Sequence, residues 1–188
     1  MPVFLRRLPT LASVLLLVST ATAPCMQAKP RDSALSEAEV DQIRETRLEP
    51  AQCIAAFVKF LDLRAQKVQD LYSHPRRPGR EDDTRELLEQ FASIADELGD
   101  NLDDYGPRHA DLRKVLPKLL QATERWATAL KSPPEEQTYS VERKFALASI
   151  GDLRQSATDL IALQEAWFKE HPPAKKEQQQ PGPIEIPR

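Results

Sequence analysis

Residues 54–72 read IAAFVKFLDLRAQKVQDLY, and this stretch decides the fold class. Its apolar residues recur at steps of three and four, whereas charged residues such as Lys59 and Asp62 fall on the other side. That spacing is the period of an α-helix with one buried face, so the stretch predicts an amphipathic helix of about six turns. Pro50 fits its first turn, where a missing N–H is harmless. The apolar face consists of Ile54, Phe57, Val58, Leu61, Ala65, Val68, Leu71 and Tyr72.

Three further segments show the same helical period, and turn residues separate them. Asp82 or Asp83 is placed to cap the first, after a loop at residues 74–79. Gly106 and Pro107 separate the second segment from it, and a Ser-Pro-Pro break at residues 132–134 precedes the third, which runs from about 138 to 170. The predicted buried stripes are Leu87, Leu88, Phe91, Ile94, Ala95, Leu98 and Leu102; then Leu112, Val115, Leu116, Leu119, Leu120, Thr123, Trp126, Ala127 and Leu130; then Val141, Phe145, Ala146, Ile150, Leu153, Ala157, Leu160, Ile161, Trp167 and Phe168.

A shorter helix over residues 36–47 precedes these segments. Ser36 and Glu39 have the spacing of a capping box, in which each side chain bonds the other's backbone N–H. Val40 and Ile43 give this helix a narrow apolar edge. The sequence therefore predicts an all-α fold, an antiparallel bundle of four long helices with coiled-coil packing plus a short N-terminal helix.

The bundle domain is predicted to span residues 36–171, between two segments without a packed core. Residues 29–35 read as a flexible lead-in. Residues 172–188 hold five prolines and a glutamine tract, with few apolar groups to bury. Such a composition predicts a disordered tail.

Pro117 interrupts the stripe between residues 108 and 131. A proline inside a helix removes one backbone hydrogen bond and collides with the carbonyl four residues earlier. Two outcomes are open: either the helix 108–131 bends at Pro117, or residues 107–116 form a separate short helix that ends before it.

Residues 1–28 have the layout of a cleavable signal peptide. Arg6 and Arg7 precede an uncharged apolar run at residues 11–18, and small residues follow. The run is too short to cross a bilayer of about 30 Å as a helix. Cleavage after Ala21, Ala23 or Ala28 is compatible with the pattern. We therefore expect an exported protein, periplasmic or secreted, with no transmembrane span after signal removal.

The two cysteines, Cys25 and Cys53, leave three readings open. Cys25 is removed with the signal, pairs with Cys53 in an oxidising compartment, or carries a lipid as an N-terminal cysteine. Pro24 directly before Cys25 argues against lipidation, and removal is the reading we favour. Cys53 opens an apolar helical face, as a small core residue does.

The charge balance excludes one large class of partner. The formal net charge is −3, and it becomes −5 once residues 1–28, with Arg6 and Arg7, are removed. A nucleic-acid-binding protein shows a basic footprint instead, so we expect no nucleic-acid partner. The same surface disfavours anionic membranes.

No residue pattern indicates a catalytic, cofactor-binding or metal site. The histidines His74, His109 and His171 show none of the spacings that build metal sites in helices. The serines read as caps, loop residues or helix-surface residues, and no glycine-rich phosphate loop is present. The acidic runs read as a helix start and solvated faces: Glu81, Asp82, Asp83, Asp96, Glu97, Asp100, Asp103 and Asp104.

Among the aromatic residues, Phe60 falls to one side of its helix's apolar face. It widens the apolar arc beyond one seam. Two readings are open: Phe60 packs against the short first helix, or it forms part of a groove for a partner.

The segments LSEAEVDQIR at 35–44, Glu49-Pro50 and FLDLR at 60–64 resemble uncharacterised exported helical proteins of bacteria. The resemblance covers residues 35–168 and implies an exported helical fold with no known activity. A weaker resemblance is to small periplasmic stress chaperones with an L-T-x-x-Q motif, where this chain has Leu35, Ser36 and Glu39. Neither resemblance assigns a role to any residue.

We expect an exported, non-enzymatic helical bundle that acts by binding another protein or the envelope. The partner is not identified by the sequence. The alternative is an enzyme, hydrolase-like, whose acidic residues converge only in the fold.

Overall fold

The computed structural model describes residues 34–172 as five α-helices and one 3-10 turn. The elements are α1 (Glu37–Thr46), α2 (Pro50–Ser73), α3 (Arg80–Tyr105), α4 (Leu116–Lys131), η1 (Gln137–Tyr139) and α5 (Ser140–Glu170). No strand occurs within this range, so the all-α prediction is confirmed. The predicted signal peptide and all but one residue of the predicted tail lie outside the described residues. Of the predicted flexible lead-in, Ala34 and Leu35 are described, and Leu35 is buried.

The N-terminus of α1 forms as the capping pattern predicts. The Glu39 N–H donates to Ser36 Oγ at 3.4 Å, and the Ser36 N–H donates to Glu39 Oε2 at 2.8 Å. Together these bonds satisfy two donors that a helix start leaves free. Pro50 likewise occupies the first turn of α2, as predicted.

The helices α2 and α3 form an antiparallel hairpin. Arg64 Nε donates to Gln90 Oε1 at 3.2 Å, while Thr84 Oγ1 donates to Tyr72 Oη at 3.3 Å, so residues further along α2 meet earlier residues of α3. The prediction that Asp82 or Asp83 caps α3 is wrong. Gly79 is the N-cap, with φ at 81°, a conformation that glycine adopts without strain.

The start of α3 at Arg80 places three acidic residues within its first turn: Glu81, Asp82 and Asp83. Negative charge there interacts favourably with the positive end of the helix dipole. The dipole interaction adds to the ion pairs that Glu81 forms with Arg80 and Asp83 forms with Arg77.

The helices α4 and α5 form a second antiparallel hairpin. Arg154 Nη2 donates to Glu124 Oε1 at 3.3 Å in its middle, and Arg143 Nη1 donates to the Pro133 carbonyl at 2.8 Å near its turn. Gly151 does not interrupt α5, and nothing lies within 4 Å of where its Cβ would be.

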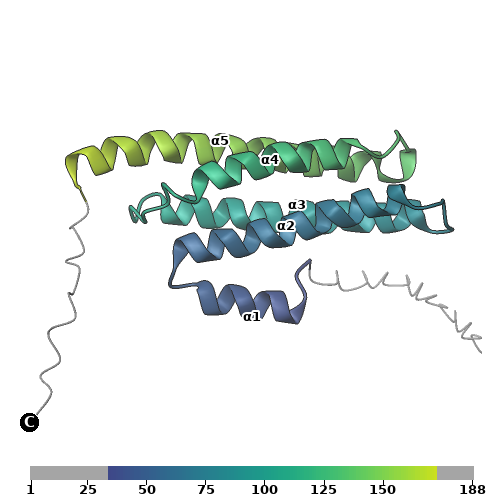
Figure 1. Cartoon of the computed structure of the whole chain (residues 1–188), viewed down its shortest axis with the longest axis horizontal. Coiled ribbons are helices and arrows are strands. Elements are labelled where there is room, and N and C mark those ends of the chain that lie inside the picture. Colours follow the sequence, from purple (N-terminus) through teal and green to yellow (C-terminus); the bar gives the residue numbers. More distant parts are fainter. Residues whose placement is uncertain (1–33, 173–188) are drawn as a thin grey trace, which may run out of the picture. The chain divides into compact units, whose positions relative to one another are not determined.

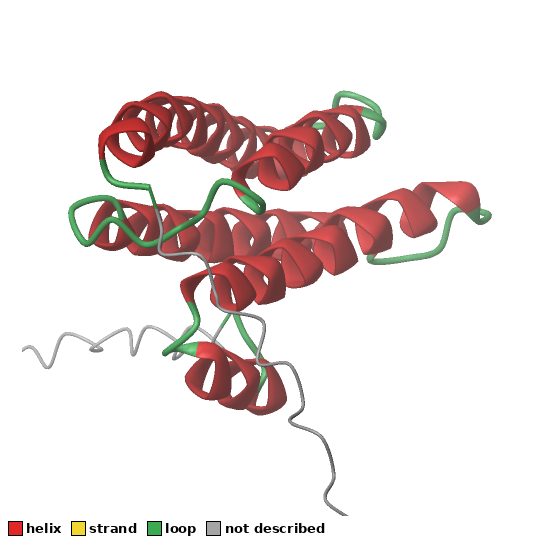
Figure 2. Ribbon diagram, turned by 60° about the vertical axis from the view of Figure 1, so that its left-hand side comes forward, coloured by secondary structure: helices red, strands yellow, loops and turns green. Residues whose placement is uncertain are grey.

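The two hairpins lie on each other in two layers, with α2 beside α4 and α3 beside α5, while α1 packs on α2 (Figures 1 and 2). Asp96 of α3 bonds Ser149 of α5, and Gly106, directly after α3, faces Leu160 of α5. Both members of these pairs advance along the chain, so α3 and α5 run in the same direction. The two helices of each hairpin thus run in opposite directions, whereas α3 and α5, which belong to different hairpins, run in the same direction.

The core fills the space between the hairpins with the predicted stripes of α2, α3 and α4. Phe91 on α3 meets Trp126 on α4 edge to face, with ring centroids 5.6 Å apart. Phe60 is buried as well, so its ring is not exposed to solvent in this structure. The fully buried large side chains are Trp126, Tyr139, Phe57, Phe60, Phe91, Ile54, Leu61, Leu88, Ile94, Leu98, Leu102 and Leu112.

Two residues predicted in the stripe of α5 are exposed instead. Val141 is 54% exposed and Phe145 is 64% exposed. The buried face here consists of Arg143, Ala146 and Ile150. The first turns of α5 therefore bury a different face from the predicted one. The buried face includes Arg143, a charged residue that a hydrophobic pattern assigns to solvent.

Both predictions for Pro117 are wrong. Residues 107–115 form turns without a helix, and α4 begins at Leu116, which places Pro117 in the first helical turn. A proline there loses no hydrogen bond and bends nothing. Leu112 and Val115 are buried as the stripe predicts, but a turn places them: the Val115 and Leu116 N–H groups both donate to the Leu112 carbonyl.

Among the helices of residues 34–172, none combines the length and the hydropathy that a membrane crossing requires.

Candidate functional site

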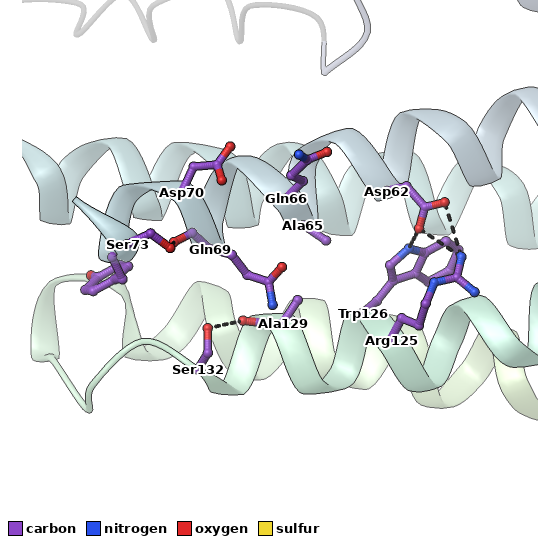
Figure 3. A pocket seen from close by; sticks show the side chains of 11 residues that line it. Asp62, Ala65, Gln66, Gln69, Asp70, Ser73, Arg125, Trp126, Ala129 and Ser132 are labelled. Carbon is purple, nitrogen blue, oxygen red and sulfur yellow. Dashed lines mark hydrogen bonds and ion pairs between the residues drawn. The ribbon is translucent and has the colours of Figure 1, made fainter.

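A polar groove of about 870 Å³ lies between α2 and α4. It is open along one side and follows the interface between the two hairpins (Figure 3). Small-molecule pockets are mostly apolar and bury most of their ligand, so this groove differs from them. The lining residues are Asp62, Ala65, Gln66, Gln69, Asp70, Tyr72, Ser73, Arg125, Trp126, Ala129 and Ser132.

At one end of the groove, Asp62 joins the two helices. Its Oδ1 accepts a hydrogen bond of 2.7 Å from Nε1 of the buried Trp126, and both carboxylate oxygens lie 3.2 Å from Arg125 Nη2. The indole N–H is thereby satisfied, as a buried indole requires. Asp62 is thus a structural acceptor that fixes the spacing of α2 and α4.

Amide and hydroxyl groups line the rest of the groove. Figure 3 shows the Gln69 side chain reaching from α2 toward Ala129, whereas Asp70 points away from α4. Ser132 donates to the Ala129 carbonyl at 2.7 Å, which closes the last turn of α4. A primary amide offers two donors and one acceptor oxygen, so Gln66 and Gln69 can pair with a peptide backbone.

A tyrosine pair closes the other end of the groove. Tyr72 Oη donates to Tyr139 Oη at 3.0 Å, and Tyr139 Oη donates to the Pro134 carbonyl at 2.7 Å. Burial raises the pKa of Tyr139 well above its ordinary value, and the bond to Tyr72 adds to the effect. The Arg143 guanidinium lies 5.5 Å from the Tyr139 ring centre. This network joins the two hairpins, because Tyr72 lies on α2 and Tyr139 lies between α4 and α5.

The structure separates His74 from the other two histidines. The His74 ring lies 2.8 Å from the Asp70 carbonyl at the end of α2. His109 and His171 each stack on the Trp167 ring, with ring centroids 3.6 and 3.9 Å apart, respectively. This stacking packs the end of α5 against the loop that contains His109. The backbone φ angle of His109 is 51°.

Acidic residues of the predicted runs bond neighbouring side chains: Glu81 accepts from Arg80, Asp83 from Arg77 and Asp104 from Arg108. Asp96 accepts a 2.8 Å bond from Ser149, a buried serine that the sequence analysis assigned wrongly to caps, loops or helix surfaces. Burial raises the pKa of Glu97, and the nearby Asp100 adds to this. In the same range, no group of three or more His, Cys, Asp or Glu side chains has the geometry to hold a metal ion.

Among the buried polar side chains that the sequence analysis did not foresee are Gln164 and Arg64. Gln164 on α5 donates to the Ala110 carbonyl at 2.6 Å and accepts from the Leu112 N–H at 3.0 Å. Arg64 on α2 bonds Glu39 of α1 and Gln90 of α3. Their positions on a predicted apolar arc are the signal of burial in the sequence: Gln164 lies four residues after Leu160, and Arg64 lies four residues after Phe60.

Cys53 is buried, in line with the prediction of a core residue, while Cys25 lies outside the described residues. Burial raises the pKa of Tyr105, and the neighbouring Cys53 adds to the shift. The three readings for Cys25 remain predictions.

No protein-family model matches the chain, and neither a curated protein nor a solved structure matches it. The groove between α2 and α4 is therefore interpreted from its own geometry.

Proposed function

We propose that the chain is an exported, non-enzymatic helical bundle that binds an extended peptide segment of another protein in the groove between α2 and α4. The observation that carries the proposal is the groove itself. It is open and about 870 Å³ in volume, and its lining includes the amide and hydroxyl groups of Gln66, Gln69, Tyr72, Ser73 and Ser132. An extended segment presents backbone N–H and C=O groups that such side chains can satisfy.

The proposal includes the arrangement of the four long helices as one antiparallel bundle built from two hairpins. Trp126 supports it, because this side chain packs on Phe91 of the other hairpin and bonds Asp62 on α2. A bundle held at these points keeps the groove walls fixed. Binding to a fixed groove requires little ordering of the receptor.

The export part of the proposal rests on residues 1–28 and their signal-peptide layout. A periplasmic or secreted location would place the groove where envelope proteins are available. Mass spectrometry of the exported protein tests this part, because a mature form that retains Met1 contradicts it.

An enzyme is the less favoured alternative. Asp62, the carboxylate in the groove that faces α4, already accepts bonds from Trp126 and Arg125. A general base needs a free lone pair within reach of a substrate proton. Both oxygens of Asp62 accept hydrogen bonds from α4, which supports a structural role for this carboxylate.

Affinity capture from envelope extracts tests the proposed function. Gln69→Lys places a charge and a longer side chain in the groove, whereas Gln155→Lys makes the same change on an exposed turn of α5. We expect Gln69→Lys to lose a captured protein that wild type and Gln155→Lys both retain. Equal capture by all three proteins would contradict the proposal.

A further inference from the structure

The short helix α1 is joined to α2 by an ion pair between Glu39 and Arg64, whose side chains are largely buried. Arg64 Nη2 lies 2.7 Å from Glu39 Oε2, and Arg64 Nη1 bonds the other carboxylate oxygen. The same guanidinium donates to the Ala34 carbonyl at 2.9 Å and to Gln90 at 3.2 Å. Arg64 is buried, so it needs a carboxylate on the helix that covers it.

The apolar contribution of α1 is small. No residue of α1 is fully buried, and Val40 and Ile43 are partly buried against the core. A helix of ten residues is marginal in water on its own. Its stability as a helix therefore depends on the surface that it covers.

The helix α2 has a second buried face, and α1 packs on α2. Cys53, Ala56 and Phe60 lie on the same side of α2 as Arg64, at helical spacings of three and four, and all are buried. The other buried face, with Ile54 and Leu61, forms the core between the hairpins. In Figure 1, α1 runs along the N-terminal half of α2, which carries these residues.

The connection between α1 and α2 is short. Only Arg47, Leu48 and Glu49 separate the two helices, and Leu48 is 92% exposed. Pro50 disfavours a helical conformation at Glu49, so the two helices cannot merge into one. Release of α1 would leave the α2 face with an apolar strip and an unpaired Arg64.

We propose that the α2 face beneath α1 is a docking site for an amphipathic helix of a partner protein, and that α1 is the chain's own competitor for this site. The partner helix begins with Ser or Thr, carries Glu three residues later, and presents an apolar edge one turn beyond. The carboxylate pairs with Arg64, and the apolar edge covers Phe60. This site lies on a different face of α2 from the groove with Gln69, so it is independent of the proposed function.

A synthetic peptide of residues 34–48 with a fluorescent label is the probe, and full-length protein is the receptor. In the variant Glu39→Lys the tethered α1 is repelled by Arg64, while the α2 face is unchanged. We expect this variant to bind the native peptide at least tenfold more tightly than wild type does. Glu37→Lys changes an exposed residue of the same turn and should bind like wild type.

Two further measurements keep the test decisive if Glu39→Lys fails to fold. Ile43→Asp weakens α1 on its apolar edge without touching Arg64, and it should show the same gain. Wild type itself should bind the native peptide at millimolar concentration, which is the scale of the effective concentration of a tethered segment. A peptide of residues 34–48 that carries Glu39→Lys should not bind the wild-type protein.

Equal binding of the native and the Glu39→Lys peptides to wild type, or no gain in either variant, would overturn the proposal. Dimerisation of wild type that the native peptide reverses would overturn it too, because the occupant would then be α1 of a second copy.

Discussion

Gln164 on α5 holds the backbone of Leu112 in the loop before α4. Its Oε1 accepts from the Leu112 N–H at 3.0 Å, and its Nε2 donates to the Ala110 carbonyl at 2.6 Å. A single side chain thus satisfies two backbone groups of a loop that has no helix of its own. The loop connects the two hairpins, so this pair fixes how they are joined.

Replacement of Gln164 by Leu should destabilise the fold by about 2–5 kcal/mol, because a buried N–H and a carbonyl lose their partner. Urea unfolding measures the effect. Gln155→Leu is the control, since Gln155 is an exposed residue of the same helix, and we expect a change of less than about 0.5 kcal/mol. Equal losses in the two variants would contradict a specific role for Gln164.

Leu61→Ala and Ile94→Ala should each lower the free energy of unfolding by about 2–5 kcal/mol, because both side chains are fully buried and leave cavities. Leu163→Ala is the control, since this leucine of α5 is about half exposed. If urea melts show no loss for either core variant, the buried faces are assigned wrongly.

Pro117→Ala should change the free energy of unfolding by less than about 1 kcal/mol, because the first turn of α4 needs no N–H from this residue. Gln121→Pro, one turn further into the same helix, should cost about 3 kcal/mol. Thermal melts of both variants make the comparison. A large loss for Pro117→Ala would indicate that the ring itself is needed at the start of α4.

The contribution of Glu39 to stability should depend on pH. The hydrogen bond from Arg64 lowers the pKa of the Glu39 carboxyl from 4.5 to about 2, and the bonds from Ser36 act in the same direction. The unfolded chain therefore takes up this proton at a higher pH than the folded chain. The stabilisation is complete above about pH 4.5 and is lost as the pH falls toward 2.

Urea melts of wild type and Glu39→Gln at pH 7 and pH 3 check this dependence. Arg64 is the charged group that faces the carboxylate, with the neutral Gln90 beyond it. We expect the difference in free energy of unfolding between the two proteins to shrink at pH 3. A difference that stays constant between the two pH values would contradict the ion pair.

The helical periods sufficed to predict the existence and extent of α1, α2 and α5 and most of the core. Ser36, Pro50 and the acidic turn after Gly79 are local signals, because capping depends on a few neighbouring residues. Leu61, Ile94 and Trp126 each belong to an apolar stripe with the helical period, and all three are buried.

Other features depend on contacts between distant residues, which a single sequence does not show. The loop at 107–115 looks helical by period, yet two of its backbone groups bond the distant Gln164. They are the Leu112 N–H and the Ala110 carbonyl, 52 and 54 residues away from it. Arg143 is buried because the Pro133 carbonyl and the Tyr139 ring surround it, and this burial turns Val141 and Phe145 to the surface.

The groove could not be predicted for the same reason. Asp62 and Gln69 read as the solvated side of α2, and nothing in the sequence places α4 alongside them. The pairing of Asp62 with Trp126 appears only once the hairpins are packed.

Site-specific photocrosslinking tests the central claim, that the groove between α2 and α4 binds a protein segment. A benzophenone amino acid replaces Gln66 in the groove or, as a control, Gln155 on α5, and the protein is irradiated in the envelope fraction. The account predicts one discrete adduct from position 66 that is absent from position 155, and mass spectrometry should map it to an extended segment of a single partner. The same adducts from both positions, or none from position 66, would contradict it.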